Sequence, residues 1–201
     1  MIRVLLADDQ ALVRGAMAAM LGLEADIEVV AEVGSGEDVL PAALRTAPDV
    51  ALLDVQMPGA DGLTVAADLH ARLPACRVIV CTTFGRPGYY SRAMAAGAAG
   101  FVVKDAAPEH LVEAVRRVHA GLRAVDPVLA EQSRAHGPNP LTSRERDVLR
   151  AASAGATVAD IAARLHLSNG TVRNHLSAAI GKTGTTTRTE AAHTADENGW
   201  L

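Results

Sequence analysis

Short apolar runs alternate with amphipathic segments through the first 120 residues of the chain. The apolar runs, which predict buried strands, are 2–7, 27–33, 49–54, 77–82 and 99–103. The segments with apolar residues spaced by three and four, which predict helices, are 10–22, 37–47, 61–73, 88–96 and 108–120. Such alternation indicates a parallel sheet covered on both faces. We therefore expect an α/β flavodoxin-like (βα)5 domain over residues 1–120, with a doubly wound sheet of order 2-1-3-4-5.

The pattern changes after this domain. Residues 121–139 hold Asp-Pro and Gly-Pro pairs typical of turns, so we expect a linker with one short helix at 128–135. Beyond it the pattern is wholly helical and predicts helices at 143–154, 158–165, 169–181 and 187–197. Thr142 and Glu145 have the spacing of a capping box at the start of the first of these. We expect a second, small all-α domain over residues 140–201.

Composition narrows the class of protein. Of the 201 residues, 49% are hydrophobic but only 2% are aromatic, so the core must consist mainly of Ala, Val and Leu. No run approaches 18 apolar residues and the chain begins with a strand rather than a signal peptide, so we expect a soluble, cytoplasmic protein. Cys76 and Cys81 are too few for a disulfide framework and lack metal-ligand spacing, which indicates reduced core thiols.

The net charge of −4 is unevenly distributed. Residues 1–125 carry 11 Lys and Arg against 15 Asp and Glu, whereas residues 139–201 carry 7 against 6. A surplus of one positive charge is low for a domain that binds nucleic acid. Only two of the 19 basic residues are lysines, Lys104 and Lys182, so each is a candidate for a specific role.

Charged and hydroxyl side chains stand at the C-terminal ends of four predicted strands. Asp8 and Asp9 follow the first strand, Asp54 ends the third, Thr82 ends the fourth and Lys104 follows the fifth. In the expected order these strands are neighbours, so their ends meet at the edge where such sheets bind ligands. Three carboxylates there repel one another, and oxygen ligands favour Mg²⁺. With Lys104 and Thr82 available for a phosphoryl group, the constellation suits phosphoryl transfer to Asp54.

Each of these residues also has a purely structural interpretation. Asp8 and Asp9 could cap the following helix, Lys104 could be a solvated strand end, and Thr82 could be present as a β-former. Their joint occurrence at four adjacent strand ends favours a functional site.

Two other kinds of site fit less well. Gly34 and Gly36 after the second strand resemble a dinucleotide-binding loop, but the third glycine position is Val39 and the strand is the wrong one. An aspartyl phosphatase of the haloacid dehalogenase type also places a nucleophilic Asp after a strand. It needs a second Asp two positions later as acid and base, where this chain has Gln56.

Residues 157–182 predict a helix-turn-helix, with residues 167–170 as its turn. The second helix could lie in a major groove of DNA, where Arg and Asn suit guanine and adenine edges. The candidate DNA-binding residues are Ser168, Thr171, Arg173, Asn174, His175, Ser177 and Lys182. A helical module for protein interaction or dimerisation is the alternative.

Three motifs of the first domain resemble those of response-regulator receiver domains. They are Ala-Asp-Asp at 7–9, Leu-Asp-Val-Gln-Met-Pro-Gly at 53–59 and Ala-Gly-Ala-Ala-Gly-Phe-Val-Val-Lys-Asp at 96–105. The resemblance implies that Asp54 accepts phosphate from a sensor histidine kinase, with no other enzymatic activity than this self-catalysed transfer and slow dephosphorylation.

The same resemblance assigns roles around Asp54. The implied Mg²⁺ ligands are Asp9, Asp54 and the Gln56 backbone carbonyl directly, and Asp8 through a water molecule. Thr82 would bond a phosphoryl oxygen and Lys104 would form an ion pair with it. Phe101 would turn inward behind Thr82. All four Phe and Tyr residues fall between positions 84 and 101, which fits either a face that repacks between two states or ordinary packing of a helix on a sheet edge.

The second domain resembles the C-terminal domain of NarL/FixJ-type regulators, whose helix-turn-helix is of the LuxR type. The resemblance rests on residues 141–149, 170–175 and 188–191. Residues 82–90 and 198–201 further resemble the subgroup that controls lipid desaturase genes with a membrane thermosensor kinase. These likenesses imply a transcription regulator in which phosphorylation of Asp54 promotes homodimerisation, through the first and last receiver helices, and binding to promoter DNA. RNA polymerase is a further candidate partner.

Two alternatives stay open: a regulator that binds DNA independently of phosphorylation, and an aspartyl-phosphate phosphatase. The chain also departs from the family pattern near its end. Thr183 and Thr185 replace Leu and an aliphatic residue, and Gly181 lies inside the recognition helix. Glycine there costs about 1 kcal/mol against alanine, so we expect a loosely packed junction to the last helix.

Overall fold

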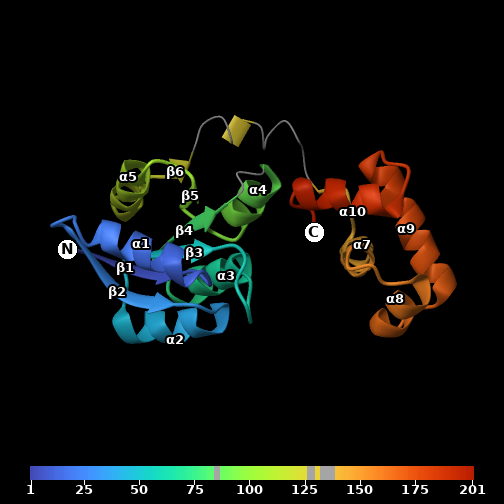
Figure 1. Cartoon of the computed structure of the whole chain (residues 1–201), viewed down its shortest axis with the longest axis horizontal. Helices are drawn as coiled ribbons and strands as arrows, with labels where there is room; N and C mark the ends of the chain where they lie inside the picture. Colours follow the sequence, from blue (N-terminus) through green and yellow to red (C-terminus); the bar gives the residue numbers. More distant parts are fainter. Residues whose placement is uncertain (84–86, 126–129, 132–138) are drawn as a thin grey trace. The chain divides into compact units, whose positions relative to one another are not determined.

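The computed structural model describes residues 1–83, 87–125, 130–131 and 139–201 (Figure 1). These residues form two compact units, one made mainly of residues 1–131 and the other of residues 139–201. Within the described ranges, no helix is both long and apolar enough to cross a membrane.

The first unit is built on a parallel six-stranded sheet of order β2-β1-β3-β4-β5-β6. Its strands are β1 (Ile2–Ala7), β2 (Ile27–Val33), β3 (Val50–Asp54), β4 (Arg77–Thr82), β5 (Gly100–Val103) and β6 (Ala124–Val125). The first five strands and their order confirm the prediction. The sixth corrects it, because β6 pairs with β5 inside the stretch 121–139 that was predicted to be linker. Two residues are too few to show a hydrophobic period, so the sequence pattern could not reveal this strand.

Helices cover both faces of the sheet. They are α1 (Ala11–Leu21), α2 (Gly36–Thr46), α3 (Gly62–Arg72), α4 (Pro87–Ala95) and α5 (Pro108–His119). Val4, Leu6 and Leu52 are buried in one core cluster with residues of α1 and α5. The alternate strand residues Leu5 and Leu53 are fully buried as well, on the face contacted by α2 and α3. This alternation confirms the doubly wound architecture.

The second unit consists of helices around a small core, which confirms the predicted all-α domain. Its helices are α7 (Ser143–Ser153), α8 (Val158–Leu165), α9 (Asn169–Thr183) and α10 (Arg188–Glu197). The predicted recognition helix ended at residue 181, but α9 continues through Gly181 to Thr183. The Thr183 hydroxyl donates to the Ala179 carbonyl at 2.9 Å, and Gly184 ends the helix in the left-handed region at φ 67°. The helix predicted at 128–135 lies outside the described residues apart from 130–131.

Gly62 lets two backbone segments approach closely at the end of β3. A Cβ atom on Gly62 would lie 1.9 Å from the Asp54 carbonyl oxygen. The Gly62 N–H donates to the Val55 carbonyl at 2.9 Å, and Asp61 caps α3 by accepting from the N–H groups of the next turn. No larger residue fits this approach. Gly15 in α1 differs, since a Cβ there would have no atom within 4 Å.

We predict opposite effects of alanine at these two helical glycines. Gly62→Ala should destabilise the first unit by about 1–3 kcal/mol, because the clashing atoms are backbone and cannot move cheaply. Gly15→Ala should stabilise it by about 0.5–1 kcal/mol, because alanine is the better helix former. Calorimetry of the full chain measures both. Trp200 is the only tryptophan and lies in the second unit. When the same unfolding is followed by tryptophan fluorescence, the calorimetric transition that has no fluorescence counterpart belongs to the first unit. An unchanged transition in Gly62→Ala would contradict the prediction.

Candidate functional site

The sheet brings the predicted residues of the first unit together at one edge. β1, β3, β4 and β5 are neighbours, and Asp8, Asp54, Thr82 and Lys104 stand at their C-terminal ends. Asp8 is 0%, Asp54 5% and Thr82 6% exposed, although Asp and Thr usually lie at the surface. Asp9, beside them, is exposed. Buried carboxylates need partners, and here the partner is a lysine.

Lys104 bridges the two buried carboxylates. Its Nζ lies 2.7 Å from Asp8 Oδ2 and 3.1 Å from Asp54 Oδ2. The angles at Lys104 Nζ and Asp8 Oδ2 do not meet those of a hydrogen bond. We treat both contacts as ion pairs, because attraction between full charges depends on distance rather than on angle. The second oxygen of Asp8, Oδ1, accepts the Gln10 N–H at 3.0 Å.

The ionisable groups in this pocket shift one another's pKa. Burial raises the pKa of Asp54 above its ordinary value, and the neighbouring Asp8 raises it further, while Lys104 acts in the opposite direction. Burial alone would lower the pKa of Lys104, but close contact with Asp8 and the charge of Asp54 outweigh it and raise the pKa. A single ammonium thus accompanies the three carboxylates of Asp8, Asp9 and Asp54, which gives the pocket more acidic than basic groups.

The carboxylates fit a divalent cation. One oxygen each of Asp8, Asp9 and Asp54 lies within 4.8 Å of the others. Ligand sets made only of oxygen atoms suit Mg²⁺, which retains water and binds phosphate as a co-ligand. Gln56, whose backbone carbonyl is the further predicted ligand, follows Asp54 by two positions and is exposed.

Thr82 and Phe101 lie on the neighbouring strands β4 and β5. The backbone N–H of Lys104 donates to the Thr82 carbonyl at 2.7 Å, which ties the ends of β4 and β5 together. Phe101 is 3% exposed, and its ring meets Tyr90 of α4 edge to face at a centroid distance of 5.9 Å. The predicted switch residue therefore belongs to the packing between the sheet edge and α4.

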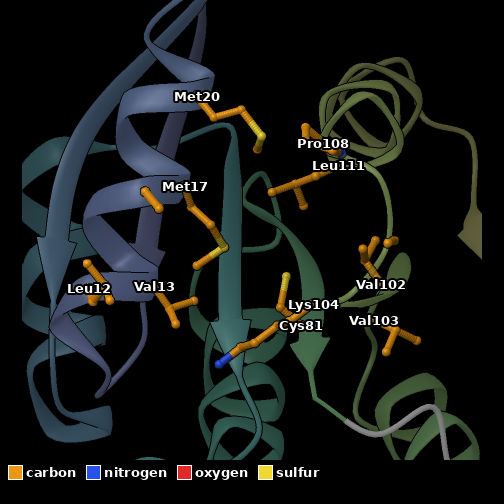
Figure 2. A pocket seen from close by; sticks show the side chains of 12 residues that line it. Leu12, Val13, Met17, Met20, Cys81, Val102, Val103, Lys104, Pro108 and Leu111 are labelled. Atoms are coloured by element: carbon orange, nitrogen blue, oxygen red, sulfur yellow. The ribbon is translucent and has the colours of Figure 1, made fainter.

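A cavity of about 290 Å³ opens between α1 and α5, next to the acidic pocket. Figure 2 shows Met17 and Met20 of α1 and Cys81 of β4 turned toward it, with Lys104 at its edge. Cys76 and Cys81 are both free and buried, as predicted. Burial raises the pKa of the Cys81 thiol to about 12, so it lines the cavity as a neutral group.

The second unit has the predicted helix-turn-helix in α8 and α9. His166 ends α8 with φ 54°, and the Ser168 hydroxyl caps α9 by accepting the Thr171 N–H at 3.1 Å. Val172, Leu176 and Ala179 bury the inner face of α9. The predicted DNA-binding residues divide by exposure: Ser168, Arg173, Asn174, Ser177 and Lys182 are exposed, whereas Thr171 and His175 are half-buried.

Lys182 has a partner that sequence reasoning missed. Its Nζ contacts both carboxylate oxygens of Glu145, at 2.8 and 3.0 Å. Glu145 Oε2 also accepts the Thr142 N–H at 2.7 Å, which completes the predicted capping box. The sequence indicated only the capping role, because a contact between positions 37 residues apart leaves no mark in a local pattern.

The two units match two families. Residues 4–116 match the response regulator receiver domain, and residues 139–195 match the luxR family of bacterial regulatory proteins. The chain is 43% identical to the uncharacterised transcriptional regulatory protein YvfU and 39% identical to the transcriptional regulatory protein DesR, both from Bacillus subtilis and both covered over 100% of each chain. The crystal structure of the response regulator ChrA is 33% identical with a TM-score of 0.59, covering 100% of this chain and 98% of that one.

This chain therefore belongs to the response regulators that join a receiver domain to a LuxR-type DNA-binding domain, and within them it groups with regulators such as YvfU and DesR. It is a DNA-binding transcription regulator.

We predict that the Glu145–Lys182 pair makes the stability of the second unit depend on acid pH. Burial opposes ionisation of Glu145, but Lys182 and the Thr142 N–H outweigh it and lower the pKa. The contribution should therefore be complete above the unfolded value of about 4.3 and should disappear as the pH falls through the lower folded pKa.

Thermal unfolding followed by Trp200 fluorescence measures this. The stability difference between wild type and Glu145→Gln should shrink as the pH falls from neutral to acid. Lys182→Met should weaken this pH dependence, because it removes the charge that holds the Glu145 pKa low. A wild-type to Glu145→Gln difference that stays constant over the acid range would contradict the prediction.

Proposed function

We propose that a sensor histidine kinase phosphorylates Asp54 and that phosphorylation switches DNA binding. The observation that carries the proposal is the Lys104 bridge between Asp8 and Asp54, beside a third carboxylate at the same sheet edge. A structural ion pair would need one carboxylate for one lysine. A third carboxylate beside such a pair instead provides ligands for a cation and a nucleophile for a phosphoryl group.

Each residue has a task in the transfer. An Asp54 carboxylate oxygen forms the new bond to phosphorus while the phosphorus–nitrogen bond of the kinase's phosphohistidine breaks, and the electron pair stays on the histidine nitrogen. Lys104 exchanges the Asp54 carboxylate for a phosphoryl oxygen, and the Thr82 hydroxyl donates to another. When bound by Asp8, Asp9, Asp54 and the Gln56 carbonyl, Mg²⁺ supplies further charge neutralisation. Transfer to the protein's own aspartate, with slow hydrolysis, involves no turnover of another substrate.

Dimerisation through α1 and α5 connects this chemistry to DNA. The sequence of α1 is apolar except at Arg14 and Gly15, yet Leu21 is its only fully buried residue, and Ala11, Leu12, Ala16 and Ala19 are exposed. An apolar helix left open on its outer side is typical of an interface. Leu12, which is 87% exposed, stands at the rim of the cavity between α1 and α5. A second copy of the chain is the partner that we propose for this face.

We predict that Mg²⁺ with beryllofluoride, which stands in for a phosphoryl group on Asp54, converts the wild type from monomer to dimer. Light scattering measures the change. Asp54→Ala should stay monomeric because it lacks the acceptor carboxylate. Leu12→Glu should also stay monomeric, because a charge would be buried in the interface, whereas Leu23→Glu, at an equally exposed leucine beyond the end of α1, should dimerise like wild type.

Equal fractions of dimer in wild type and Asp54→Ala in this light-scattering experiment would instead support a regulator that acts independently of phosphorylation. Promoter activation by Asp54→Ala at the wild-type level in cells would support the same alternative.

We predict that Lys104→Ala separates phosphorylation from dimerisation. The variant retains Asp54 and the carboxylates that bind the cation, so a small-molecule phosphodonor should still label it. Without the ammonium to follow the phosphoryl group, the labelled variant should remain monomeric in light scattering. Full dimerisation of phosphorylated Lys104→Ala would show that this lysine does not transmit the switch.

A further inference from the structure

Lys182 in the last turn of α9 has an incomplete set of partners. A lysine ammonium has three N–H donors, and two of them face the two carboxylate oxygens of Glu145. The Lys182 side chain is nevertheless 38% exposed, whereas that of Glu145 is only 6% exposed. The lysine side of the pair is therefore open to solvent.

The surface beside Lys182 is open to a close approach. Gly181 is exposed, and a Cβ atom there would have no atom within 4 Å. No packing within the second unit thus requires glycine at this helical position, where alanine is the better helix former. Ala178, one turn before Lys182, is exposed and small as well. A bulky molecule such as a DNA backbone could reach the Lys182 ammonium across these residues without displacing side chains.

Glu145 holds this ammonium in place. Its carboxylate is itself fixed from the other side by the Thr142 N–H at 2.7 Å, in the first turn of α7. An unrestrained lysine loses rotamer entropy when it is immobilised. Because the pair already exists without DNA, part of that entropy has been lost before binding.

We propose that Glu145 is a positioning residue for a DNA-backbone contact: it occupies two donors of Lys182 and leaves the third for a phosphate oxygen. The inference rests on the binding of DNA by α9 and adds a residue outside the helix-turn-helix to the interface. The Glu145 carboxylate has two opposing effects on DNA binding, because it orders the Lys182 side chain but also screens the positive charge of Lys182. Ordering outweighs screening.

A double-mutant cycle on the full chain separates these effects. Binding of wild type, Lys182→Met, Glu145→Gln and the double variant to a random-sequence DNA duplex is measured by fluorescence anisotropy over a range of salt concentrations. Phosphate contacts are independent of sequence, so no operator is required. Lys182→Met should weaken binding and reduce the slope of log K against log salt by up to about 0.9. Lys182→Arg should retain most of the slope.

The cycle decides the role of Glu145. If Glu145 positions Lys182, the Lys182→Met substitution weakens DNA binding by a larger factor in the wild type than in the Glu145→Gln background. Equal factors in the two backgrounds overturn the proposal. A larger factor in the Glu145→Gln background also overturns it, because screening by Glu145 then outweighs ordering. Arg150→Met is the matched control, since it removes one exposed charge from α7, which is not the recognition helix. Trp200 fluorescence verifies that each variant is folded.

A second measurement needs no variant. The chain contains only two lysines, so the side-chain ammonium signals of ¹⁵N-lysine-labelled protein can be assigned to Lys104 and Lys182. Addition of the duplex should shift the Lys182 signal and leave that of Lys104 in place. An unchanged Lys182 signal at saturating DNA overturns this inference, while binding of the duplex itself still supports the function of the domain.

Discussion

Repulsion among carboxylates at one sheet edge is the constraint on which the receiver unit depends. The parallel order of β1, β3, β4 and β5 forces the residues after these strands into one place, so Asp8 and Asp54 cannot avoid each other. Two buried anions without a counter-ion would cost several kcal/mol. Lys104 offsets this cost through its ion pairs with both carboxylates. In the proposed mechanism, a cation and a phosphoryl group at Asp54 would give Lys104 a new partner, so the charge balance that stabilises the fold would also respond to phosphorylation.

The fold and the composition of this pocket could be predicted from the sequence because both follow from periodicity. Once apolar runs and amphipathic segments alternate, the strand order places Asp8, Asp54, Thr82 and Lys104 at one edge. The contacts could not be predicted in the same way. That Lys104 comes closer to Asp8 than to Asp54, or that Gly62 allows α3 to pass the end of β3, depends on side-chain packing and backbone approach between distant positions.

The second unit shows the same division between local and distant information. Its capping boxes and helices are local and follow from residue types and spacing, whereas the partner of Lys182 does not. Gly181 was expected to lie inside the recognition helix, and α9 does continue through it. Gly184, in the left-handed region three residues later, is where the helix ends. An exposed glycine with no neighbour lowers helix stability without stopping the helix, because the backbone hydrogen bonds remain intact.

Because the DNA-binding unit has a low net positive charge, dimerisation is important for its affinity for DNA. Residues 139–201 carry only one more Lys and Arg than Asp and Glu, and one of those cations, Lys182, is already paired with a buried carboxylate. A single unit with few free cations releases few counterions from DNA and binds weakly. Linking two such units makes the second binding event intramolecular and can raise affinity by about 10²–10⁴ without any new contact. If phosphorylation of Asp54 promotes dimerisation through α1 as proposed, weak binding by the monomer is an advantage, because DNA occupancy then depends on the charge state of Asp54.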